Sequence, residues 1–199
     1  MIKTLQNLAL FKLGWIACVV FAAAGQPIAS LLSVAAVAAI HLLRVPAPRK
    51  EGLFLLAAAV IGLTWESALV MSGLLAYPGA SPDAMLAPLW IVAMWVLFAT
   101  TVNHGMSWIK RNALIAALAG LIGGPLAFLG GVKAGAAEFS DTTLALTALG
   151  LGWAVLLPLM ALIADTIIDS PILEPRQRQS RRPSLSRLVF PGRRLGQNV

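Results

Sequence analysis

Six apolar runs, each long enough to cross a lipid bilayer, dominate this chain of 199 residues. About 17 to 25 mostly apolar residues span the hydrocarbon core as a helix. In lipid such a run has to be helical, because a helix satisfies its own backbone hydrogen bonds within one pass. We place the runs at residues 7–24, 27–43, 52–75, 85–108, 113–132 and 143–164. The sequence therefore predicts an all-α, polytopic membrane protein, a bundle of about six transmembrane helices.

The composition agrees with a membrane protein and argues against a nucleic-acid-binding one. Charged residues make up only 12% of the chain, about half of the 25% that is usual in soluble domains. The net charge is +7, but seven of the 15 basic residues follow Pro175, so the excess is local and does not indicate nucleic acid as a partner. Cys18 is the one cysteine, which excludes an intrachain disulfide.

The connections between the runs differ in charge, and this difference predicts the orientation. Lysine and arginine accumulate on the cytoplasmic side of membrane proteins. If the N-terminus is cytoplasmic, 13 of the 15 basic residues lie on that side. Outside the tail these are Lys3, Arg44, Arg49, Lys50, Lys110 and Arg111. We therefore expect a multi-pass membrane protein with both termini in the cytoplasm.

The tail at 171–199 differs from the predicted six-helix transmembrane domain at 1–170. Its arginines are mixed with Ser, Gln and Pro, which build no core, so we expect it to be disordered. One interpretation is a solvated anchor that fixes the topology, and the other is a clamp on anionic lipid head groups. The arginines concerned are Arg176, Arg178, Arg181, Arg182, Arg187, Arg193 and Arg194.

Glu66 is the clearest candidate for a functional residue inside the membrane, because an ionisable group in hydrocarbon is costly. It shares a helix face with Ala59 and Gly62, and small residues allow close helix approach, so we expect it to face the bundle interior. The functional interpretation is a proton carrier, a general acid or a cation-binding carboxylate. The alternative is a protonated carboxyl that hydrogen-bonds a neighbouring helix and only locks the packing.

A second polar group is expected near the cytoplasmic ends of several helices. It comprises Lys12, His41, Thr100, Asn103, His104 and Asp165. These residues are predicted to line one vestibule for an anionic head group or a polar substrate, with Lys12 paired to Asp165 or Asp169 and a histidine as the proton-transfer group. The alternative is that Lys12 extends to the interface and the others are ordinary interfacial residues.

Sequence fingerprints of cofactor and metal sites are absent. His41, His104 and Asp165 resemble a ligand set, but no HExxH or paired His–carboxylate spacing supports it. GxSxG, P-loop and GxGxxG patterns are missing too. The sequence therefore predicts neither a metal nor a cofactor. It leaves Glu66 and His104 as candidate catalytic residues and otherwise favours a protein that is not an enzyme.

The fifth run carries a stripe of small residues, Gly120, Gly124, Ala127 and Gly131, which predicts a close helix contact. Pro125 lies within this run and predicts a kink or break, because proline cannot donate a backbone hydrogen bond.

Several features of the sequence resemble an uncharacterised bacterial family of small multipass inner-membrane proteins with a domain of unknown function. The resemblance extends from Asn7 to about Ala164 and excludes the tail. Its residues are Asn7, Phe11-Lys12-Leu13-Gly14-Trp15, Glu66, Pro88-Leu89-Trp90, Trp95, Phe98, Trp108 and Gly124-Pro125-Leu126. The resemblance implies an acidic residue, often Asp, at the place of Glu66, and a Gln at the place of Lys12. It also implies gene neighbours that resemble cyclopropane-fatty-acid synthases and amine-oxidase-like flavoproteins.

Three functions follow as expectations. The first is an accessory membrane component linked to membrane-lipid modification, with membrane lipids and a membrane enzyme or a second copy of the chain as partners. The second is a small proton- or cation-coupled transporter or permease that uses Glu66. The third is a membrane-embedded lipid-modifying enzyme that uses Glu66 or His104.

Overall fold

The computed structural model describes residues 2–80 and 85–170, and helices account for most of them. The elements, in chain order, are α1 (Ile2–Ala23), α2 (Pro27–Arg44), α3 (Pro48–Met71), β1 (Leu75–Ala76), α4 (Leu89–Val102), the 3-10 helix η1 (Ser107–Arg111), α5 (Ala113–Lys133), β2 (Glu138–Phe139) and α6 (Thr142–Asp169). All of them belong to one unit that ends at Asp169. The predicted basic tail at 171–199 lies outside the described residues.

The predicted helical membrane bundle is confirmed. Five helices, α1, α2, α3, α5 and α6, are long and apolar enough to cross a membrane. The fourth helix is shorter than predicted, because α4 has only 14 residues, fewer than the roughly 20 that a full crossing needs. It begins after Pro88 and ends at Val102, where the N–H groups of His104 and Met106 both donate to the Thr101 carbonyl and turn the chain.

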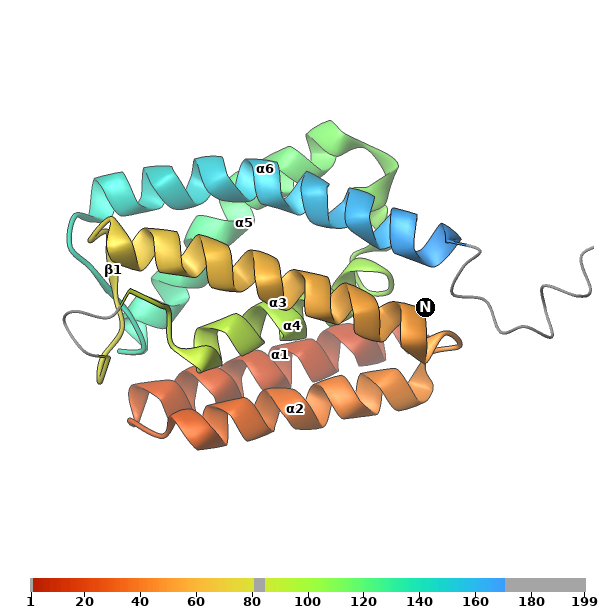
Figure 1. The fold of residues 1–199 in the computed structure, drawn as a ribbon, viewed down its shortest axis with the longest axis horizontal. Helices are drawn as coiled ribbons and strands as arrows, with labels where there is room; N and C mark the ends of the chain where they lie inside the picture. Colours follow the sequence, from red (N-terminus) through yellow and green to blue (C-terminus); the bar gives the residue numbers. More distant parts are fainter. Residues whose placement is uncertain (1, 81–84, 171–199) are drawn as a thin grey trace, which may run out of the picture. The chain divides into compact units, whose positions relative to one another are not determined.

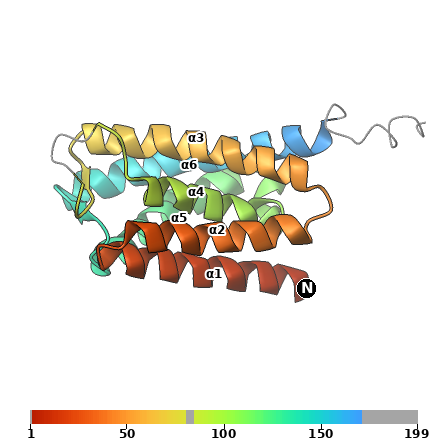
Figure 2. The same ribbon diagram turned by 60° about the horizontal axis from the view of Figure 1, so that its bottom comes forward.

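The short helix α4 lies at the centre of the bundle. Figures 1 and 2 show it between α3 on one side and the α1–α2 pair on the other, with α6 also in contact. Nine of its 14 residues are buried, a pattern expected of a helix that is surrounded by other helices rather than by lipid. The remaining helices present large apolar side chains outward, among them Leu32, Leu56, Leu126 and Val155. Those side chains suit a lipid environment.

Two glycines let α5 and α6 pack closely. A Cβ atom at Gly120 would come within 2.1 Å of the Trp153 carbonyl oxygen, and one at Gly124 within 2.3 Å of the Trp153 ring. The predicted contact of the small-residue stripe is confirmed for these two positions. Pro125 does not break α5, which continues to Lys133.

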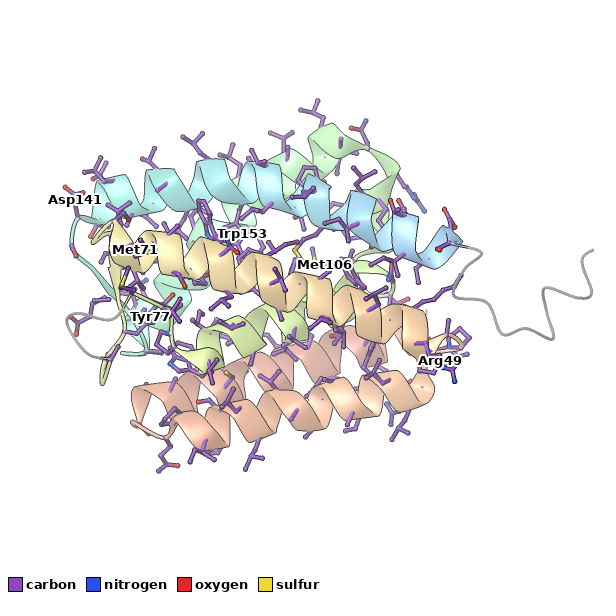
Figure 3. The ribbon with its side chains drawn as sticks, in the orientation of Figure 1. Arg49, Met71, Tyr77, Met106, Asp141 and Trp153 are labelled. Atoms are coloured by element: carbon purple, nitrogen blue, oxygen red, sulfur yellow. The ribbon has the colours of Figure 1, made fainter. Side chains whose placement is uncertain are left out.

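The two ends of the bundle differ in structure and in charge. At one end, β1 pairs with β2 in antiparallel register, Leu75 opposite Phe139, and joins the α3–α4 connection to the α5–α6 connection. At the other end lie the start of α1, the end of α2, the start of α3 and the η1 helix. Figure 3 labels Tyr77 and Asp141 at the β1–β2 end and Arg49 at the opposite one. We call these the hairpin end and the basic end. The basic end carries Lys3, Arg44, Arg49, Lys50, Lys110 and Arg111.

Replacing Gly120 with alanine should destabilise the bundle, because the new methyl group meets the α6 backbone and cannot be relieved by a side-chain rotation. We expect a loss of about 1–3 kcal/mol, the usual cost of overpacking. Gly123→Ala is the matched control, since nothing lies within 4 Å of a Cβ there. Thermal unfolding of both variants in detergent, followed by tryptophan fluorescence, measures the difference. Equal melting temperatures would contradict this account of the α5–α6 contact.

Candidate functional site

Glu66 lies in the C-terminal third of α3 and is completely buried, with 0% of its surface exposed. It faces the bundle interior as predicted. Its two carboxyl oxygens accept hydrogen bonds from two different segments. The Tyr77 hydroxyl donates to Oε2 at 2.7 Å, and the Trp95 indole N–H donates to Oε1 at 2.8 Å. Within residues 2–80 and 85–170, no lysine, arginine or histidine forms an ion pair with this carboxyl.

Local sequence explains how the two donors reach Glu66. Gly62, one helical turn earlier, leaves room for Trp95, because a Cβ atom there would come within 2.4 Å of the indole. At the end of α3, Gly73 adopts a φ of +71°, a left-handed conformation that glycine tolerates. The chain then turns back, and Tyr77 reaches Glu66. The pKa of Tyr77 is raised well above its ordinary value, mainly by burial and to a smaller extent by the nearby Glu66 carboxylate. The phenol therefore remains a hydrogen-bond donor.

The Glu66 carboxyl borders a cavity of about 90 Å³ that is lined mainly by aromatic side chains. The lining includes Phe11, Trp15, Tyr77, Trp90, Trp95, Phe98, Phe128 and Trp153. Ala127 and Gly131, which were predicted to form a helix contact, line this cavity next to Phe128 of the same helix. We call this space the aromatic cavity. Tyr77, Ala136 and Ala137 place it towards the hairpin end.

Stacked rings hold the wall of the aromatic cavity in place. Trp95 and Trp153 stack with their ring centroids 4.6 Å apart, and Phe98 meets Trp153 edge-on at 5.3 Å. Elsewhere in the lining, Tyr77 meets Trp90 edge-on, with ring centroids 5.4 Å apart. Such pairs prefer these offset and edge-to-face geometries and restrict the rings. The cavity wall is therefore preorganised around the carboxyl.

A second buried carboxylate, Glu51, lies in the first turn of α3 near the basic end. The His104 ring nitrogen Nε2 is 2.9 Å from Glu51 Oε1, and His41 Nε2 is 3.4 Å from Oε2. The two imidazole rings meet edge-on with their centroids 5.0 Å apart. Glu51 and His41 are buried, whereas the His104 side chain is 30% exposed. Two imidazoles and one carboxylate can share a proton or coordinate a cation.

Polar side chains around Glu51 hold it in position. The Asn103 amide lies 3.4 Å from both carboxyl oxygens of Glu51 and accepts a hydrogen bond from Lys110 Nζ at 2.9 Å. Lys110 also forms an ion pair with Asp165 near the end of α6. Asn7 connects α1 to the same region, because it donates to the Thr100 carbonyl and accepts from the Gly105 N–H, both at 3.0 Å.

A larger cavity of about 510 Å³ adjoins this cluster at the basic end. Its polar lining comprises Lys3, Thr4, Gln6, Asn7, His41, Arg44, Thr100, Asn103 and His104. We call it the basic cavity, because Lys3 and Arg44 are its charged residues apart from the histidines. It matches most of the vestibule that the sequence predicts. Lys12 and Asp165 are not among its lining residues.

The predicted pairing of Lys12 with Asp165 or Asp169 is wrong for Asp165, whose partner is Lys110. Lys12 is exposed, and its Nζ lies 4.6 Å from the centre of the Trp15 ring, a cation–π contact within its own helix. Asp165 does not join the two histidines either, because Glu51 occupies that place. The tail arginines lie outside the described residues, so their binding to lipid head groups stays a prediction.

The sequence analysis did not propose several residues of these sites as functional, among them Glu51, Tyr77 and Trp95. Glu51 follows Arg49 and Lys50 in what reads as a charged connection, yet it lies in the first turn of a helix that begins at Pro48. Proline at the first helical position followed by an acidic residue is a signal for such a start. Tyr77 and Trp95 lack a comparable signal, since Tyr77 reads as a turn residue and Trp95 as a packing residue.

Comparison with known proteins is consistent with this picture and adds no activity. No curated protein and no solved structure matches the chain. A family described as "Protein of unknown function (DUF2878)" matches residues 4–159. This range includes nearly all of α1, all of α2 to α5, most of α6 and every described residue of the two sites except Lys3 and Asp165. The chain therefore belongs to the DUF2878 family of proteins of unknown function.

Proposed function

We propose that the protein is a small membrane carrier that binds a compact organic ammonium ion in the aromatic cavity, with Glu66 as the counter-charge. The observation that carries this proposal is a completely buried carboxyl that borders a cavity walled by aromatic rings. An ionised carboxylate in such a place needs a positive charge nearby, or else it takes up a proton. Glu66 therefore exchanges a proton for a bound cation.

The aromatic rings favour an organic cation over a metal ion. Faces of Trp and Tyr attract ammonium groups, most strongly where water is excluded, and cages of such rings bind quaternary ammonium ions. The cavity offers Trp15, Trp90, Trp95 and Trp153 together with Tyr77. Its volume of about 90 Å³ restricts the ligand to a few heavy atoms, since sites for drug-sized ligands usually measure about 300 Å³ or more.

Choline binding to the purified protein tests this proposal, with 3,3-dimethylbutan-1-ol as the uncharged ligand of the same shape. We expect choline to quench tryptophan fluorescence and the neutral alcohol to have little effect. Because binding displaces a proton from Glu66, the affinity should rise with pH, by up to about tenfold per pH unit while the free carboxyl is protonated.

Glu66→Gln should abolish choline binding, while Glu138→Gln, the same change at an exposed position of the hairpin end, should not. In proteoliposomes with a pH gradient, the unmodified protein should accumulate choline and Glu66→Gln should not. If the unmodified protein binds neither ligand and Glu66→Gln only lowers the melting temperature, Glu66 is a packing residue and the proposal fails.

The second candidate is the lipid-linked role implied by the family resemblance, and the basic cavity favours it. Lys3 and Arg44 line a space of about 510 Å³ at one end of the bundle, and such residues suit an anionic lipid head group. An accessory component and a membrane-embedded lipid-modifying enzyme both fit this arrangement. A second copy of the chain or a membrane enzyme is the proposed partner.

Mass spectrometry of acyl chains from a deletion strain and its parent tests the lipid-linked role. We expect the deletion to change the proportion of modified acyl chains, and re-expression of the chain to restore it. Re-expression of a Lys3→Ala, Arg44→Ala variant should not restore it. Identical acyl-chain profiles in the deletion and parent strains would remove this candidate.

We further propose that the basic end lies in the cytoplasm and the hairpin end in the periplasm of a bacterial inner membrane. The concentration of basic residues at one end supports this orientation. Alkaline phosphatase fused after Gly79 or Gly135 should be active, whereas a fusion after Val45 or Asn112 should be inactive. Green fluorescent protein, which fluoresces in the cytoplasm, should give the reverse pattern. Phosphatase activity at Val45 would contradict the orientation.

A further inference from the structure

We propose that His41, Glu51 and His104 bind a divalent transition-metal ion at the edge of the basic cavity. One ligand atom of each residue lies within 4.8 Å of the others. The three residues come from three separate segments: His41 from the last turn of α2, Glu51 from the first turn of α3, and His104 from the turn after α4. This site is separate from Glu66 and does not depend on the ammonium carrier proposed above.

The distances between the three side chains suit a common metal ion. Zn–N and Zn–O bonds of about 2.0–2.1 Å in a tetrahedral site place neighbouring ligand atoms roughly 3.3–3.5 Å apart. His41 Nε2 is already 3.4 Å from one Glu51 oxygen, and His104 Nε2 is 2.9 Å from the other. An ion between them therefore requires only small side-chain movements.

The surroundings of Glu51 resemble the outer shell of a metal site. Metal-binding carboxylates are usually held by hydrogen bonds from neighbouring groups, which fix their orientation. Here the side-chain nitrogen of Asn103 lies beside both carboxyl oxygens of Glu51. Lys110 donates a hydrogen bond to the side-chain oxygen of Asn103 and so fixes the amide. Asp165 in turn pairs with Lys110. The neutral Asn103 amide, rather than Lys110, therefore lies next to the Glu51 carboxylate. The negative charge of Glu51 remains available for a cation.

The basic cavity leaves room for a further ligand. His41 and His104 both line it, and the His104 side chain is partly exposed there. Three protein ligands with an open fourth position are typical of catalytic zinc sites, whereas structural sites are closed by four. Two histidines and one carboxylate with open positions also bind non-haem iron. The geometry thus points to a reactive ion that holds a water or substrate atom in the basic cavity.

The absence of a local sequence fingerprint does not contradict this site. An HExxH pattern places both histidines on one helix, but here 63 positions separate His41 from His104 and the carboxylate lies on a third segment. Only the packing of α2, α3 and the turn after α4 brings them together. The expectation that the chain binds no metal rested on spacing along the sequence, which has no bearing on ligands assembled in this way.

Metal binding by the full chain, purified in detergent, tests the proposal. The chain has only two histidines and one cysteine, so a tag without histidines leaves few competing sites. After treatment with EDTA, the protein should bind one Zn²⁺ per chain in competition with a chromophoric chelator. Co²⁺ should give visible absorption bands of a four- or five-coordinate ion. A parallel titration with Fe²⁺ under argon shows which ion binds more tightly.

His104→Ala and Glu51→Gln should each weaken Zn²⁺ binding by at least tenfold and remove the Co²⁺ bands, and Asn103→Ala should weaken it by a smaller factor. Of these substitutions, His104→Ala should disturb folding least, because the His104 side chain is partly exposed. Glu66→Gln, on the same helix but in the other site, should retain full metal binding. Zn²⁺ should raise the melting temperature of the unmodified protein but not that of His104→Ala.

Two results would overturn the proposal. One is a folded, unmodified protein that binds neither Zn²⁺, Co²⁺ nor Fe²⁺. The other is metal binding that persists unchanged in a folded His104→Ala protein. Because choline binding is measured separately on the same preparations, failure of the carrier proposal and failure of the metal proposal are distinguished.

Discussion

Hydrocarbon offers no hydrogen-bond partner, so a buried polar group of this bundle is stabilised by a partner inside the protein. Among the described residues, the indole N–H groups of Trp65 and Trp153 are the buried side-chain groups that lack one. The internal partners connect the helices at defined points. Ser30 on α2 donates to the Cys18 carbonyl on α1 at 2.9 Å, and Ser67 on α3 accepts from the Ala87 N–H just before α4. Glu66 joins α3 to α4 and to the hairpin end through Trp95 and Tyr77. The polar contacts thus set the register in which the apolar surfaces pack.

The central position of α4 follows from the same constraint. The helix is too short to cross the membrane alone, and the irregular chain on either side of it exposes backbone groups. Such backbone is tolerated at membrane depth only where protein or water surrounds it. The surrounding helices supply this shelter. The backbone N–H groups of Ala87 and Gly105, just beyond the two ends of α4, donate hydrogen bonds to the side chains of Ser67 and Asn7. Both sites of the protein use residues of α4 or of the turn that follows it.

One helix carries both buried carboxyls. Glu51 and Glu66 are 15 positions apart on α3, about 22 Å along the helix axis, so they lie towards opposite ends of the bundle. Aromatic rings surround Glu66, and histidines surround Glu51. The first environment suits an organic cation, and the second suits a proton or a metal ion. A carboxyl of the same type therefore has a different environment at each end, because its neighbours differ.

The sequence by itself determined the number of helices, the membrane as solvent, the burial of Glu66 and the difference in charge between the two ends. Each of these follows from the apolar runs, or from the spacing and kind of residues along one helix. Only the tertiary structure decided which polar residues meet. It paired Lys110 rather than Lys12 with Asp165 and placed Glu51 between the two histidines. It also placed the Trp95 indole N–H, which reads as part of a packing residue in the sequence, where it donates a hydrogen bond to Glu66. Helical periodicity indicates which face of a helix is buried, but it carries no information about the neighbouring helix or its vertical offset. Contacts between segments far apart in the chain depend on both.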